Sequence, residues 1–65
     1  MDKKKIGKKL ALLRGNRTQK EVAQAIEVCQ STYSMYENGE RIPSDEVKKR
    51  IAGYYKCSVQ SIFYS

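Results

Sequence analysis

Apolar residues recur along this chain at the spacing of amphipathic helices. Within each of five segments they are three or four positions apart, so each set forms one stripe on a helix. The segments cover about residues 3–14, 18–26, 30–38, 44–55 and 58–63. Their stripes consist of Ile6, Leu10 and Leu13; Val22, Ala23 and Ile26; Tyr33 and Tyr36; Val47, Ile51, Tyr54 and Tyr55; and Val59, Ile62 and Phe63. No strand is predicted, so we expect an all-α bundle of five short helices.

Helix-capping residues stand at the ends of these segments. Thr18 followed by Glu21 is a capping box, in which each residue hydrogen-bonds to the backbone at the other. Ser44 and Ser58 are favourable N-caps for the fourth and fifth segments. Gly15–Asn16 follows the first segment, as glycine or asparagine often does at a helix end. The caps therefore agree with the apolar pattern on where the helices begin and end.

The charge of the chain is strongly basic and unevenly distributed. Thirteen lysines and arginines face seven acids, for a formal net charge of +6. Residues 1–20 hold eight basic residues and one acid, residues 21–47 hold six acids and one arginine, and residues 48–65 hold four basic residues and no acid. This balance suits a polyanionic partner such as nucleic acid. We expect Lys3, Lys4 and Lys5 to form a diffuse arm that adds salt-dependent affinity.

Length and composition exclude several other classes. With 65 residues, the chain is predicted to be one domain, residues 1–65. It has no histidine and few carboxylates, which argues against an enzyme and against a zinc site, and no cofactor is expected. Cys29 and Cys57 are interpreted as free thiols in a reducing cytoplasm, and no signal or membrane-spanning segment is predicted.

Residues 19–38 carry the most information about function. Two short helices meet here across a turn near residues 27–29, and Ala23 is small where the helices must approach closely. This pattern predicts a helix-turn-helix, which exposes the polar face of its second helix. Such a helix fits the major groove of B-DNA. The predicted partner is therefore double-stranded DNA.

At this point the chain resembles the helix-turn-helix regulators of the Cro and phage-repressor type, the XRE family. The matching segments are Leu13–Arg14, Thr18–Ala23, Tyr36–Gly39, Ile42–Ser44 and Ser58–Phe63. The resemblance implies a lambda-repressor-like bundle and a Cro-like transcriptional repressor that binds a near-palindromic operator as a homodimer. Many relatives come from phages and mobile elements. Two positions depart from the pattern: Glu27 replaces a common turn glycine, and Cys29 replaces the usual Ser or Thr cap.

Roles for single residues follow from the predicted unit and from the resemblance. Residues near the start of the second helix are expected to read bases, namely Gln30, Ser31, Thr32 and Met35. The expected phosphate contacts are Arg17, Gln19, Lys20, Ser34, Asn38 and Arg41. The resemblance implies a structural ion pair between Arg14 and Glu37. The expected dimer interface consists of Val59, Ile62, Phe63 and Tyr64.

Two alternatives stay open from the sequence. A controller or antitoxin-type regulator would have the same fold and would also bind DNA. A protein-interaction module would keep the bundle and lose DNA binding, so changes at Gln30 and Ser31 would have no effect while changes near Phe63 would abolish function. A fold alone does not establish which of these roles a chain performs.

Overall fold

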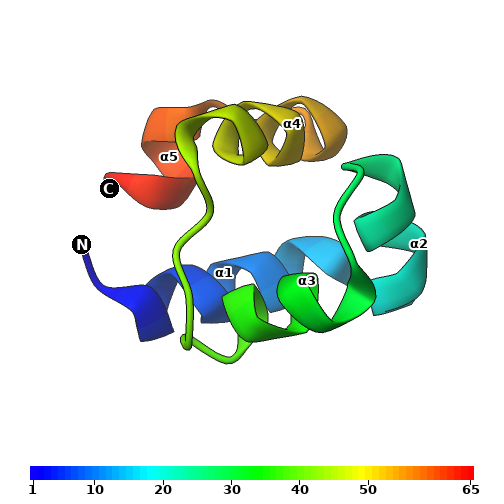
Figure 1. Ribbon diagram of the computed structural model, residues 1–65. Coiled ribbons are helices and arrows are strands. Elements are labelled where there is room, and N and C mark those ends of the chain that lie inside the picture. The colour runs from blue at the N-terminus through cyan, green and yellow to red at the C-terminus, as the bar shows by residue number, and fades with distance from the viewer.

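A computed structural model describes all 65 residues and contains five α-helices and no strand. The helices are α1 (Lys3–Arg14), α2 (Gln19–Ala25), α3 (Gln30–Glu37), α4 (Asp45–Tyr55) and α5 (Val59–Phe63). α1 and α3 pack side by side, α4 and α5 lie across from them, and α2 closes one end (Figure 1). The predicted all-α bundle of five short helices is confirmed.

The core lies where the apolar stripes meet. Its largest fully buried side chains are Leu10, Val22, Ile26, Tyr33 and Ile51, which come from α1, the α2 region, α3 and α4. Leu13, Val47 and Val59 are half-buried at its edge. Each predicted stripe therefore contributes to one continuous core.

The helix caps form as expected, with one correction at the N-terminus. The Thr18–Glu21 capping box is complete, and Ser44 and Ser58 each accept a backbone amide proton. α1 begins at Lys3, as the apolar pattern predicted, and the Asp2 carboxylate caps it by accepting the amide protons of Lys4 and Lys5. The expected diffuse arm at Lys3–Lys5 is wrong, because these lysines form the first turn of a capped helix.

A glycine allows α1 and α3 to approach closely. A Cβ atom added at Gly7 would lie 2.2 Å from the carbonyl oxygen of Glu37, well inside any allowed contact. The buried backbone of Gly7 therefore packs directly against the last turn of α3. Sequence reasoning missed this role, although a glycine inside a helix is a recognised signal of close packing.

None of the five helices combines the length and the apolar character that crossing a bilayer requires.

Candidate nucleic-acid interface

α2, a tight turn and α3 form the helix-turn-helix. Ala23 is buried between the two helices, and its carbonyl accepts a hydrogen bond of 2.9 Å from the amide of Val28. The carbonyl of Cys29 then accepts the amide proton of Tyr33, which begins the hydrogen-bond ladder of α3. The small side chain at position 23 thus permits the close crossing that the sequence predicted.

The two departures from the family pattern each have a local energetic cost. Glu27 has a φ of 61°, in the left-handed region where a side chain costs about 1 kcal/mol. Cys29 occupies the N-cap of α3 but makes no side-chain capping hydrogen bond, and losing such a cap costs about 1 kcal/mol. The turn therefore forms without the residues that favour it most.

The outer face of α3 is polar and carries no unpaired charge. Gln30 and Ser31 are exposed, whereas Thr32, Ser34 and Met35 are half-buried. Tyr33 and Tyr36 occupy the opposite face and are buried in the core. Of the residues predicted to read bases, two are thus exposed at the start of α3, and Thr32 and Met35 are partly accessible.

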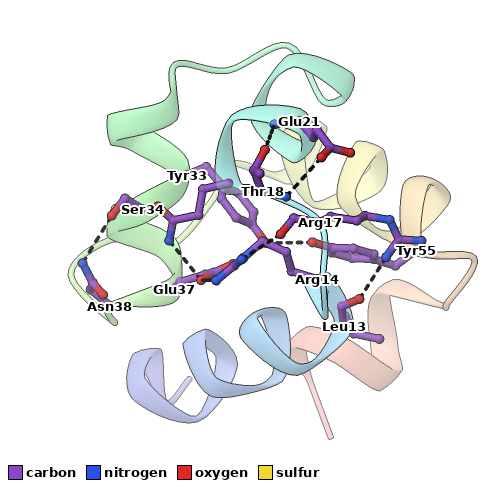
Figure 2. Close-up of polar contacts among 11 residues, drawn as sticks. Leu13, Arg14, Arg17, Thr18, Glu21, Tyr33, Ser34, Glu37, Asn38 and Tyr55 are labelled. Atoms are coloured by element: carbon purple, nitrogen blue, oxygen red, sulfur yellow. Dashed lines mark hydrogen bonds and ion pairs between the residues drawn. The ribbon is translucent and has the colours of Figure 1, made fainter.

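Glu37 ties this face to the rest of the bundle. Its carboxylate accepts hydrogen bonds from Arg14 Nε at 2.7 Å, Arg14 Nη2 at 3.1 Å and Gln19 Nε2 at 3.1 Å (Figure 2). Arg14 Nη1 also donates to the carbonyl of Arg17 at 2.8 Å. The ion pair implied by the resemblance is present, and with Gln19 it joins the end of α1, the start of α2 and the end of α3.

The Glu37 carboxylate is held in its charged form. Burial alone would raise its pKa, but the hydrogen bonds from Arg14 and Gln19 outweigh burial and lower the pKa below 4.5. The hydrogen bond to Glu37 raises the pKa of Arg14 in turn. Because the two charges neutralise each other, Glu37 adds no net repulsion toward a polyanion beside α3.

A second buried link joins α3 to α4. The hydroxyl groups of Tyr33 and Tyr55 lie 2.8 Å apart, and both side chains point toward the Arg14–Glu37 pair (Figure 2). Burial raises the pKa of both phenols above the ordinary value of 10. The sequence indicated that these tyrosines belong to the core but not that they pair with each other.

The predicted phosphate-contacting residues fall into two environments. Three of them are exposed at the borders of α3: Lys20 in α2, and Asn38 and Arg41 in the segment that follows α3. Arg17 is engaged elsewhere: its Nη1 donates to the carbonyl of Leu13, and its guanidinium lies 5.4 and 5.7 Å from the ring centres of the adjacent tyrosines of α4. Arg17 is exposed as well, but these contacts orient its guanidinium toward α4.

The expected dimer interface is only partly at the surface. Ile62 and Phe63 are buried in the core, so they cannot contact a second subunit in this structure. This corrects the expectation, which took the apolar side chains of α5 as spare surface. Val59 is half-buried and Tyr64 is 52% exposed, and these two define the accessible edge of α5.

A buried lysine also escaped sequence reasoning. Lys48 in α4 donates a hydrogen bond of 2.9 Å to the hydroxyl of Tyr64. Its ammonium lies 4.9 Å from the ring centre of Tyr64 and 5.7 Å from that of Phe63. Lys48 thereby attaches the C-terminal segment to α4.

No group of His, Cys, Asp or Glu side chains is arranged to hold a metal ion.

Comparison with known proteins identifies the family of the chain. The family model described as helix-turn-helix matches residues 8–62, most of the chain. This family consists of DNA-binding regulators. No curated protein and no solved structure matches the chain.

Proposed function

The chain belongs to the XRE-type helix-turn-helix family, and we propose on this basis that it is a Cro-like transcriptional repressor that binds a near-palindromic operator as a homodimer. The observation that carries the proposal is the outer face of α3: it is neutral, polar and accessible, and the Glu37 network holds it rigidly on the bundle. A rigid helix with short polar side chains fits a major groove that presents donors and acceptors.

Base reading is assigned to the start of α3. We propose that Gln30 makes a bidentate contact to adenine and that Ser31 and Thr32 contact neighbouring base edges or phosphates. Met35, one turn further, would contact a thymine methyl group. The exposure of Gln30 and Ser31 supports this assignment.

Phosphate binding is assigned to both borders of α3. Lys20 and Arg41 supply charge, while Ser34, Asn38 and Gln19 supply hydrogen bonds. The side-chain amide of Gln19 already donates to Glu37, so its contact would be oriented by that bond. Arg17 is the weakest member of this set because it packs on α4.

Dimerisation is assigned to the accessible edge of α5, formed by Val59 and Tyr64 above the buried Ile62 and Phe63. A two-fold dimer separates its recognition helices by about 34 Å, so the operator half-sites are expected about 10 bp apart.

The test is in vitro selection from random duplexes, followed by binding of the best site over a salt series. A two-fold-related consensus is expected, and Gln30→Ala should reduce discrimination at one base pair by about 1–3 kcal/mol. Lys20→Ala should weaken all duplexes equally and reduce the salt slope by about 0.9. Gln60→Ala and Lys49→Ala, exposed on α5 and α4, are the matched controls and should change neither quantity.

A failure to select any consensus would contradict the proposal and favour the protein-interaction module. A consensus that binds tightly without reducing transcription of a linked promoter would retain DNA binding but contradict repression. The controller and antitoxin roles share this site, and they differ in which genes carry the operator.

A further inference from the structure

The surface between α1 and α5 is hollowed on both sides of Lys9. One hollow of about 450 Å³ lies between the start of α1 and the C-terminal residues, and Ile6, Ile62 and Phe63 contribute to its apolar lining. A second hollow of about 250 Å³ lies between Leu12 and Cys57. Both hollows include Lys9 and Ile62 in their lining, so they adjoin each other, and we call the two together the α1–α5 groove.

Exposed apolar side chains gather at this groove. Three large hydrophobic residues of the chain are exposed: Met1 at 60%, Leu12 at 82% and Tyr64 at 52%. Met1 and Tyr64 line the first hollow, and Leu12 lines the second. Single exposed apolar residues are ordinary, but their concentration along one groove is typical of an interaction site.

The walls of the groove are held in position by bonds within the bundle. Lys48 fixes Tyr64 through its hydroxyl and its ring. Lys9 Nζ donates to the carbonyl of Ser61 and to the hydroxyl of Ser65, which ties α1 to the C-terminal end. The two chain ends lie on the same side of the molecule (Figure 1). A preformed surface loses less entropy when it binds.

The charge around the groove is mainly positive. Lys5 and Lys9 line it, and α1 as a whole carries six basic residues and no acid. The single acid at the groove, Asp2, already accepts two backbone amide protons as the cap of α1. A complementary partner must therefore bring apolar side chains and carboxylates together.

The groove faces away from the DNA-reading helix. Gly7 packs against α3, and Lys5 and Lys9 stand two residues to either side of it. Two residues along an α-helix correspond to a rotation of about 200°, so these lysines project from the opposite side of α1. An occupant of the groove and an operator at α3 would not compete directly for the same surface.

We propose that the α1–α5 groove is the docking site for an acidic amphipathic helix of another protein. From Lys5 to Leu12 the groove follows α1 for about 10 Å, or two helical turns, which matches a helix that presents Leu or Phe at i, i+3 and i+7. A second copy of this chain is disfavoured as occupant of the groove, because a two-fold contact there would bring the lysine-rich α1 helices together. The proposed dimer edge shares only Tyr64 with the groove, since Val59 lies outside it.

The test uses random 16-residue peptides displayed on phage and selected against the full chain. The selected peptides are expected to combine Asp and Glu with Leu or Phe at helical spacing. Amide shifts in ¹H–¹⁵N spectra should cluster in α1 and in residues 61–65 and spare α3. Leu12→Ser and Lys5→Glu should each weaken peptide binding about tenfold, because they remove a buried contact and a complementary charge.

Lys49→Glu is the matched control, because it makes the same charge change on the exposed face of α4 and should leave peptide binding within about twofold. Peptides without acidic enrichment, shifts centred on α3 or α4, or unchanged binding by Leu12→Ser would overturn the proposal. If sedimentation shows a dimer that Leu12→Ser converts to a monomer, the groove binds a second copy of the chain, and the proposal is also overturned. DNA is absent from this experiment, so it can fail while the proposed operator binding stands.

Discussion

Two buried charges are stabilised in different ways. Glu37 lies in the half of the molecule that presents α3, and Lys48 lies in the half that contains α5. The side chain of Glu37 is 5% exposed and that of Lys48 is 7% exposed. Glu37 meets an opposite charge and a carboxamide at hydrogen-bond distance. Lys48 meets a phenol and two aromatic rings, and its nearest carboxylate, that of Asp45, is 3.7 Å away and 93% exposed.

The two sets of interactions constrain the two halves of the molecule differently. The Glu37 network consists of directional, charge-assisted bonds between three helices, so it fixes their relative orientation. The Lys48 cluster relies on the lysine stem and on cation–π attraction, which tolerate small shifts. The half that presents α3 is therefore fixed mainly by charge-assisted bonds, and the half that contains α5 is held mainly by less directional contacts around Lys48.

Replacement of Glu37 is expected to have the largest effect. Glu37→Ala leaves the Arg14 guanidinium without its partner, and we expect a loss of about 3 kcal/mol in the free energy of unfolding. The loss lies at the low end for buried pairs because Arg14 is about one quarter exposed. Urea denaturation measures it. Glu40→Ala, on an exposed residue, should change stability by less than about 0.5 kcal/mol, and an equal loss in both variants would contradict the comparison.

Replacement of Lys48 is expected to lower the free energy of unfolding by less. The loss should depend on how much of the lysine stem the new side chain replaces. Lys48→Ala removes both the charge and the stem, and we expect a loss of about 1–2 kcal/mol. Lys48→Met keeps most of the stem without a buried charge and should recover most of that loss. The same denaturation experiment measures both variants. A Met variant as unstable as the Ala variant would mean that the charge itself stabilises this half.

Acid is expected to have the smallest effect on stability, and this effect should depend on Glu37. The folded-state pKa of Glu37 lies below its ordinary value of 4.5, so its stabilisation is present above pH 4.5 and is lost as the pH falls through the lower folded value. Between pH 7 and pH 2, the urea midpoint of the wild type should therefore fall more steeply than that of Glu37→Gln. Parallel curves for the two proteins would show that Glu37 does not carry this dependence.

Much of this architecture could be predicted from local sequence. Helix positions follow from apolar spacing, and Thr18, Ser44 and Ser58 act as caps because capping depends on neighbours three residues away. The Arg14–Glu37 pair is separated by 23 residues and followed from the family resemblance alone. The exposure of Gln30 and Ser31 followed from the helical period.

What could not be predicted depends on contacts distant in sequence. Lys48 is buried because α5 folds over it, whereas lysine is rarely buried and an isolated lysine indicates an exposed position. Arg17 is exposed, but its guanidinium also packs on the tyrosines of α4. The apolar stripe did not show that Ile62 and Phe63 are fully covered, because that depends on the packing of α5 against α1 and α4. These placements need the three-dimensional arrangement of the helices.

The left-handed Glu27 in the turn before α3 also bears on how long a molecule survives. A penalty of about 1 kcal/mol enlarges the unfolded fraction about fivefold, and cellular proteases act on that fraction. A ligand that binds only the folded form reduces it by mass action. Copies seated on DNA would therefore be degraded more slowly than copies in free solution, and the turnover of the regulator would follow the occupancy of its own sites.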